Sequence, residues 1–381
     1  MICQSPLKKN GTTSKGTQRW RCTTCNASTT LRRPDTATRN QLVGFTSWLL
    51  GKNDQGHHST TSARTFRRHT AWCWTISPHL RPTGQVFTEL QIDGIYIRPG
   101  WCALIAVGDG KVVGWQWCDT EKSAAWINLL SQFPQPDIVL TDGGSGIFKA
   151  LTTLWPTVRI QRCLVHVQRT VRRYVTMRPK TPAGKSLRAL SLQLTRITTR
   201  EEAATWAGLL ANWHTQYKDL INERTYAKDF TGPRPHSISS TRTWWYTHMR
   251  LRSAYHALNS PWTQGHLFAF LDPHLDAHTI SSTTNLIEGG VNAAIRTTLR
   301  QHRGMTIDHR RRAVEWVCWD KADPHTRPSL TQLAREQPQP QEPGTPQKPK
   351  PINDDGPVEY DKNFSWEDGN GLQQGWAGRH Q

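Results

Sequence analysis

Two acidic residues lie in stretches of this sequence where a carboxylate is normally avoided. Asp93 interrupts the apolar run LQIDGIYI, and Asp142 closes the run DIVLTD. An acid in a buried strand is unfavourable unless it is paired or bound to a metal ion. Glycine follows each acid, at Gly94 and at Gly143 and Gly144, and we expect these positions to leave room for a phosphate.

A third acid with the same potential is Glu288, in the stretch SSTTNLIEGGVNAAIR. Asn285, Glu288 and Asn292 recur at helical spacing and share one face of a predicted helix. Three clustered carboxylates can hold two divalent ions about 4 Å apart, which activate an attacking hydroxyl and stabilise the leaving oxygen of a phosphodiester. The sequence therefore predicts a catalytic Mg²⁺ or Mn²⁺ site formed by Asp93, Asp142 and Glu288. The alternative is that the aspartates are turn residues and Glu288 is a solvated helix acid.

The segments around the two aspartates have the patterns of a sheet covered by helices. Three β-rich stretches follow one another between Gln85 and Cys118, and they predict an antiparallel meander. After them we expect an amphipathic helix, a buried strand, a helix, and a strand running into a helix, at residues 121–133, 137–141, 146–155 and 159–167. This is the order of a ribonuclease-H-like fold, in which the first and fourth strands are neighbours. Asp93 and Asp142 would then lie side by side.

The whole chain is predicted to be a multidomain α+β protein. In chain order we expect a zinc-ribbon-like module, a helix-turn-helix, a ribonuclease-H-like mixed sheet, a helical insertion without strands that interrupts it, and a disordered tail. The Pro- and Gln-rich composition of the tail buries too little apolar surface to fold. These parts span residues 1–30, 36–80, 85–170 with 281–322, 171–280, and 323–381, respectively.

The net charge of +19 favours a polyanionic partner, and we expect double-stranded DNA. Arg64, Arg67 and Arg68 lie at helical spacing in the second helix of the helix-turn-helix, as in a recognition helix that enters the major groove. A plain basic surface helix is the alternative. Trp244 and Trp245 have two interpretations: they stack on an exposed DNA base, or they pack in a core, which is favoured.

Four segments together resemble the bacterial insertion-sequence transposases of the Mutator type. They are IDG at Asp93, TDGG at Asp142, CLVHVQR with Cys163 and His166, and TTNLIEGGVNAAIR at Glu288. The resemblance implies an Asp, Asp, Glu transposase that cleaves DNA at the inverted-repeat ends of its element and joins the 3′-hydroxyls to target DNA. We expect such an enzyme to act as a homodimer or higher oligomer on DNA.

The resemblance also implies roles for residues around the acids. Cys163 and His166 look like the family's signature pair, which positions the metal shell or the DNA backbone, or simply packs, because two residues cannot complete a zinc site. Asn285 is grouped with them as active-site support. The basic residues after Glu288 are expected to grip phosphates unless they form a solvated surface, and these are Arg296, Arg300 and Arg303.

Cys22 and Cys25 look like the second knuckle of a zinc ribbon. Related transposases begin with another Cys-x-x-Cys, whereas here only Cys3 precedes the basic turn, and its partner would fall ahead of Met1. We therefore expect an incomplete Zn²⁺ site of Cys3, Cys22 and Cys25. This pattern predicts either a start codon assigned too late or a truncated gene.

The sequence contains no apolar stretch near the roughly 18 residues of a membrane span, and we see no leader, so we expect a cytoplasmic, nucleoid-associated bacterial protein. Two other functions stay open. One is a transcription regulator whose larger domain only dimerises, and the other is a nuclease or resolvase of the same fold. The two buried-strand acids favour an enzyme, and the amino-terminal modules with the long insertion favour a transposase.

Overall fold

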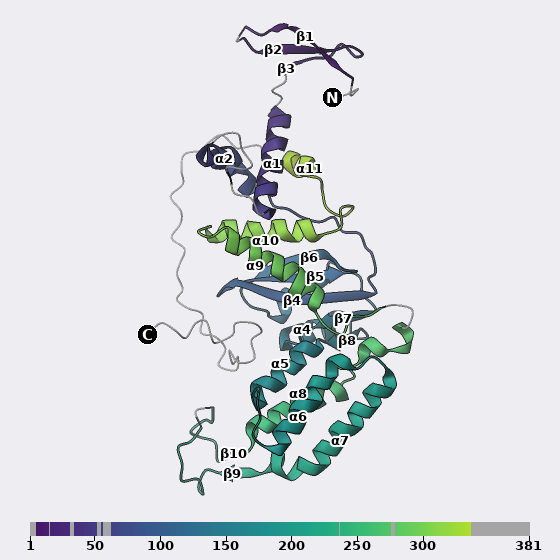
Figure 1. Ribbon diagram of the computed structural model, residues 1–381, viewed down its shortest axis with the longest axis vertical. Helices are drawn as coiled ribbons and strands as arrows, with labels where there is room; N and C mark the ends of the chain where they lie inside the picture. Colours follow the sequence, from purple (N-terminus) through teal and green to yellow (C-terminus); the bar gives the residue numbers. More distant parts are fainter. Residues whose placement is uncertain are drawn as a thin grey trace. The chain divides into compact units, whose positions relative to one another are not determined.

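The computed structural model of the protein describes residues 5–14, 16–30, 34–51, 55, 62–235, 237–275 and 279–336. The chain separates into two units, Met1–Arg335 and Glu336–Gln381, and every element below belongs to the first. Figure 1 follows the chain through these elements. Residues 337–381, most of the predicted tail, and Cys3 lie outside the described residues.

A five-stranded mixed sheet is the centre of this unit. Its strands are β4 (Glu89–Arg98), β5 (Trp101–Gly108), β6 (Lys111–Cys118), β7 (Ile138–Thr141) and β8 (Arg159–Arg162), in the order β6-β5-β4-β7-β8. The pairs β4 with β5 and β5 with β6 are antiparallel, whereas β7 is parallel to both β4 and β8. The predicted meander and the predicted neighbourhood of the first and fourth strands are confirmed.

Helices cover both faces of the sheet. Because side chains alternate between the two faces along a strand, residues of β4 pack against different helices. Leu90 and Ile92 of β4 pack with α3 (Ser123–Leu130) and α4 (Ser145–Leu154). Ile95 and Ile97 pack on the other face with η5 (Leu286–Asn292), a π-helix, and with α9 (Ala293–Gln301) and α10 (Ile307–Lys321). Figure 1 shows α9 and α10 crossing this face. The two chain segments predicted for one domain therefore form one sheet and its covering helices.

Two helices precede the sheet, as predicted for residues 36–80. They are α1 (Pro34–Leu50) and α2 (Ala63–Thr70), which continues into the 3-10 turn η1 (Ala71–Thr75). Phe66 of α2 is buried, whereas Arg64, Arg67 and Arg68 are exposed. Burial of Phe45 and Leu49 of α1 against Trp316 of α10 joins these helices to the rest of the unit.

The start of the disordered tail, predicted at residue 323, was placed too early in the chain. A short helix, α11 (Leu330–Arg335), follows α10 and packs on α1. Leu333 is 2% exposed in the cluster around Trp316. Two leucines one helical turn apart are enough to order this segment, although the composition after residue 323 is polar on average.

A helical bundle lies between the two segments of the sheet domain. Its helices are α5 (Leu164–Val175), α6 (Pro182–Gln193), α7 (Arg200–Asn222) and α8 (Met249–Thr263), with 3-10 turns η2 (Leu194–Arg196), η3 (Ala269–Leu271) and η4 (Pro273–Leu275). They share one apolar core that includes Trp206, Trp213 and Leu258. Because α5 continues to Val175, the predicted boundary at residue 170 falls inside a helix.

The expectation that the insertion has no strands is wrong. Strands β9 (Arg224–Tyr226) and β10 (Trp244–Tyr246) pair as an antiparallel ribbon. Trp245 is 5% exposed and Phe230 packs edge-on against it, so this tryptophan is in a core, as favoured. Trp244 instead lies under the Arg224 guanidinium, 4.2 Å from it. These side-chain contacts stabilise a ribbon of three-residue strands that has no strong strand pattern.

The amino-terminal module is a small antiparallel sheet of β1 (Leu7–Thr12), β2 (Gln18–Cys22) and β3 (Ser28–Thr30). Cys22 ends β2 and is buried, and Cys25 lies exposed in the turn that follows. The zinc site at these thiols stays a prediction. None of the described helices is long and apolar enough to cross a membrane.

A buried carboxylate ties α10 to β6. Glu315 is 4% exposed, accepts a 2.9 Å hydrogen bond from Trp117 Nε1 and pairs with Arg311 and Arg312. We expect Glu315→Gln to lower the free energy of unfolding by about 1–2 kcal/mol, because it keeps the acceptor and removes the charge. Urea unfolding would measure this loss. Asp320→Asn weakens a partly exposed ion pair between the end of α10 and Arg327, which follows this helix, and should change the free energy of unfolding by less than about 1 kcal/mol. Equal losses in the two variants would contradict the prediction.

Candidate active site

Asp93 lies in β4, and Asp142 comes directly after the neighbouring strand β7, where the sequence predicted them. Asp93 is 9% exposed, and its two oxygens accept hydrogen bonds of 2.9 Å from the Gly94 amide and from Asn292 Nδ2 of η5. Asp142 follows β7 and is 8% exposed. Its Oδ1 accepts from the Gly144 amide at 3.2 Å, whereas Oδ2 is buried and has no hydrogen-bond partner among the described residues.

Asp142 and Glu288 both affect the pKa of Asp93. Burial, and then the negative charge of Asp142, raise the pKa of Asp93 to about 7. His166 opposes this rise, and Glu288 adds to it. A carboxyl group with these neighbours needs a positive charge to ionise fully at neutral pH.

Glu288 comes to the site from η5 and is held by two cationic side chains. Its Oε1 lies 3.2 Å from His166 Nε2, and its Oε2 lies 3.1 Å from Arg169 Nη1. Donor atoms of Cys163, His166 and Glu288 all lie within 4.8 Å of one another, and this is the group that could hold an ion in the part of the chain that the structure describes. The three carboxylates do not converge to that distance. Glu288 is thus near enough to Asp93 to affect its pKa, but its carboxylate contacts α5.

Cys163 and His166 occupy the junction of β8 and α5. The Thr284 amide and hydroxyl each donate to Cys163 Sγ at 3.3 Å, and the same hydroxyl lies 3.3 Å from Glu288 Oε1. Burial acts to raise the pKa of Cys163, but hydrogen bonds from His166 and Thr284 hold it below its ordinary value. Burial lowers the pKa of His166, and the hydrogen bond to Cys163 and the nearby negative charges overcome this and raise it to about 9. The pair therefore connects the strand end to Glu288.

Of the two asparagines on either side of Glu288 in the sequence, Asn292 is the one that contacts an acid. Asn285 is exposed at the start of η5, whereas Asn292 is 1% exposed and donates to Asp93. The segment between them winds as a π-helix, which is rare and often occurs at functional sites. In a wider helix, residues three or seven apart no longer share the face that ordinary α-helical spacing predicts.

Two residues at the site were missed from the sequence. Glu121, just before α3, has its pKa raised to about 8 by burial and by the charges of Asp142 and Asp93. Its carboxyl group lies over Gly94, where a Cβ would come within 2.6 Å of Glu121 Cδ. Glu121 could have been found from the sequence by its position, because it is an acid directly between a predicted strand and the amphipathic helix that follows it.

The second missed residue is Arg162, at the end of β8. Its guanidinium fills the space beside Gly143, which has a φ of +93° and on which any Cβ would collide with Arg162. Burial lowers the pKa of Arg162, and the charge of Asp142 opposes this. Gly94 and Gly143 therefore do not leave open space for a phosphate as expected, because they admit the side chains of Glu121 and Arg162. Beside Gly144 the space is open, since a Cβ there would have only Asp142 Oδ1 at 4.0 Å.

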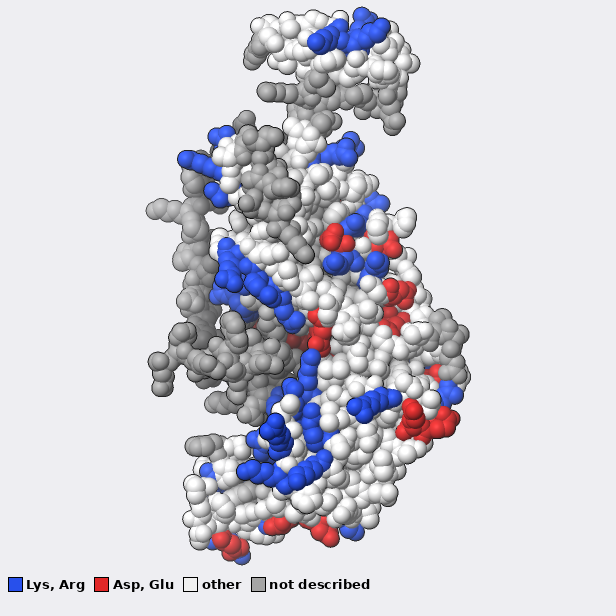
Figure 2. All heavy atoms as spheres, viewed as in Figure 1, with Lys and Arg blue, Asp and Glu red and all other residues white. Residues whose placement is uncertain are grey.

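The predicted DNA-binding arginines are all at the surface. Arg296 and Arg300 lie one turn apart on α9, and Arg303 follows the helix. Figure 2 shows Lys and Arg side chains gathered over α9 and α10 and, further along the same face, over α5 and α8. Because η5 leads into α9 and α5 carries His166, the acids lie between these two basic areas.

Comparison with known proteins finds similarity to transposases. Residues 79–229 match the family described as "Transposase, Mutator family", a range that includes Asp93, Asp142, Cys163 and His166 and stops before Glu288. A curated relative, the "Transposase for insertion sequence element IS905" of Lactococcus lactis subsp. lactis (strain IL1403), is 26% identical over 164 residues. The match covers 38% of this chain and 40% of that relative, so the chain spans about two fifths of the relative's length. The resemblance to bacterial insertion-sequence transposases of the Mutator type, indicated by the four motifs, is therefore confirmed.

Proposed function

We propose that this protein is a transposase that binds the inverted-repeat ends of an insertion sequence, cuts the DNA and joins the 3′-hydroxyl ends to target DNA. The observation that carries the proposal is the placement of Asp93 and Asp142, both buried and at neighbouring strands, with Glu288, from a distant segment, near enough for its charge to act on Asp93. The order of strands and helices supports a ribonuclease-H-like fold for this domain. Both comparisons are to transposases, which act on DNA.

Asp93, Asp142 and Glu288 would hold Mg²⁺ or Mn²⁺. Asp93 and Asp142 fit such an ion, since Asp142 Oδ2 is buried without a hydrogen-bond partner among the described residues and Asp93 is held in a cluster of negative charge. Glu288 would join them by turning from His166 and Arg169. Hard cations prefer carboxylate oxygens of this kind. When bound, the ion would activate a hydroxyl and stabilise a leaving oxygen of the phosphodiester.

Other residues of the chain would orient the carboxylates and supply positive charge for a DNA phosphate. Asn292 and the Gly94 amide fix the orientation of the Asp93 carboxylate. His166 and Arg169 hold Glu288 and supply positive charge where a DNA phosphate would approach. Arg162, beside Asp142, adds a third cation. The proposal also includes zinc binding at Cys3, Cys22 and Cys25. It further includes assembly as a homodimer or larger oligomer.

The arginines of α2 are proposed to contact DNA phosphates. Arg67→Ala is expected to weaken binding to an end duplex and to reduce the slope of log Kd against log salt by about 1, because each phosphate contact releases counterions. Fluorescence anisotropy at several salt concentrations measures both. Lys218→Ala, which removes a charge from the exposed side of α7, should leave the slope unchanged. A slope that Arg67→Ala does not alter would rule out this contact.

The function is tested with labelled duplex carrying the inverted repeats, incubated with the full chain in Mg²⁺ or Mn²⁺ and a second, unlabelled duplex. A transposase cuts at the repeat ends and joins them to the second duplex. A transcription regulator would bind without cutting, and a nuclease or resolvase of this fold would cut without that joining. Either of these outcomes would contradict the proposal.

A further inference from the structure

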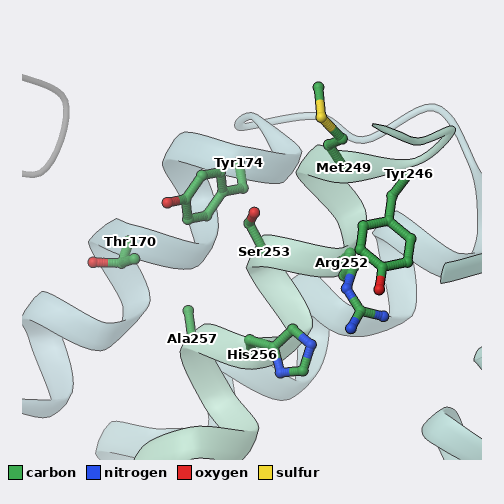
Figure 3. A pocket seen from close by; sticks show the side chains of 8 residues that line it. All are labelled: Thr170, Tyr174, Tyr246, Met249, Arg252, Ser253, His256 and Ala257. Atoms are coloured by element: carbon green, nitrogen blue, oxygen red, sulfur yellow. The ribbon is translucent and has the colours of Figure 1, made fainter. Parts of the chain in front are cut away.

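A pocket in the helical bundle has the chemistry of a nucleobase site. It lies between α5, α8 and β10 and has a volume of about 480 Å³, within the usual range of ligand sites. Figure 3 shows Tyr174 of α5 and Tyr246 of β10 on either side of Ser253 of α8. The two phenol rings offer apolar faces, and the hydroxyls of Ser253 and Thr170 offer hydrogen bonds at the pocket wall.

The charge of the pocket selects against a cationic ligand. No acidic residue is among the described residues that line it. Arg252 Cζ lies 4.0 Å from the centre of the Tyr246 ring, and Arg252 Nη1 donates to Asn222 Oδ1 at 2.6 Å, so this guanidinium is fixed at the wall. Burial, together with the charges of Arg252 and His214, lowers the pKa of His256, which keeps its ring neutral and able both to donate and to accept.

The position of the pocket relates it to the acids. His166, Thr170 and Tyr174 are spaced four residues apart on α5 and lie along one side of that helix. His166 contacts Glu288, whereas Thr170 and Tyr174 line the pocket. At about 1.5 Å per residue they lie about 6 and 12 Å further along the helix. A strand whose phosphodiester lies at the acids would thus bring an adjacent nucleotide to the pocket.

Basic side chains continue along the same path. Arg250 of α8 donates to the Tyr174 and Arg173 carbonyls at 3.0 and 2.6 Å, which fixes the end of α5 against α8. Arg169, Arg173 and Arg250 are exposed, and the basic area over α5 and α8 is visible in Figure 2. Aromatic faces within a basic channel are the combination by which proteins bind unpaired bases of a single strand.

We propose that this pocket binds an unpaired DNA base next to the phosphodiester that is cut. The inference rests on the proposed function for the location of that phosphodiester. It assigns to the helical insertion the task of holding a strand end open, with Tyr174 and Tyr246 stacking on the base and Ser253, Thr170 and His256 contacting its edge.

The test measures the binding of the full chain to a labelled single strand and to the same strand annealed to its complement, without divalent metal. Tyr246→Ala and Ser253→Trp, which fills the pocket without removing a ring, should each weaken single-strand binding about tenfold or more and leave duplex binding unchanged. Tyr246→Phe keeps the stacking face and should bind as the wild type does. Tyr226→Ala, which removes an exposed tyrosine from the adjacent strand β9, is the matched control.

A base analogue such as 2-aminopurine, placed in turn near the cutting position, should be quenched at one position, and Tyr246→Ala should abolish that quenching. Unchanged single-strand affinity in Tyr246→Ala and Ser253→Trp would overturn the proposal, and so would an equal loss on duplex DNA. Cutting of repeat ends by the wild type is scored separately. If cutting is absent and the single-strand effect stands, the proposed function fails while the base pocket holds.

Discussion

Asp142→Asn is expected to abolish cutting of DNA ends, by at least about a thousandfold, because several kcal/mol of metal-dependent stabilisation would be lost. The substitution removes the negative charge and replaces a carboxylate oxygen with an amide that cannot bind a divalent ion well. It removes no contact predicted with DNA, so the affinity for an end duplex should stay within about twofold. Cutting and binding are measured on the same labelled duplex.

Asp137→Asn provides the matched control, because Asp137 is exposed just before the other end of β7. It makes the same chemical change outside the site and should cut as the wild type does. If Asp142→Asn cut at the wild-type rate, the assignment of Asp142 as a metal ligand would be wrong.

Asp93→Asn is expected to abolish cutting and, at the same time, to stabilise the metal-free protein. Burial and the charge of Asp142 raise the pKa of its carboxyl group to about 7 in the folded protein, from 3.8 for an unperturbed side chain. As pH rises through this window, the unfolded chain loses the proton first, so the folded state becomes progressively less stable. The amide cannot ionise and avoids this penalty. The gain at about pH 8 should be roughly 2–4 kcal/mol.

Thermal or urea unfolding at two pH values checks this expectation. The difference between Asp93→Asn and the wild type should be large at about pH 8 and small at about pH 4, where the carboxyl is protonated in the folded protein and about half protonated in the unfolded chain. Adding Mg²⁺ or Mn²⁺ should stabilise the wild type and not the variant, since only the wild type gains a ligand. A variant that is less stable than the wild type at the higher pH would contradict the burial argument.

The sheet could be predicted because its patterns are local. The runs around Asp93 and Asp142 are apolar enough to be strands in any fold, and the turns between the first three strands contain glycine. Both glycines of those turns, Gly100 and Gly110, have positive φ. The order of strands and helices then left few arrangements, and the neighbourhood of β4 and β7 followed from it.

The details of the site depend on contacts that no local pattern reveals. Glu121 and Arg162 reach the acids only because the fold brings the start of α3 and the end of β8 to Gly94 and Gly143. The direction of Glu288 depends on His166 and Arg169, and its helix is wound as a π-helix. Likewise the β9–β10 ribbon and α11 are ordered by tertiary packing that their own sequences only weakly indicate.

The division of the sheet domain into two segments also governs how the protein is made. The strands that carry Asp93 and Asp142 leave the ribosome first, and η5, α9 and α10 follow only after the whole helical bundle. At about 5–20 residues per second, this is a delay of many seconds. During that time one apolar face of the sheet is uncovered and Glu288 is absent. A nascent chain is therefore exposed to aggregation, and under the proposed function it is also harmless to the DNA around it until synthesis is nearly complete.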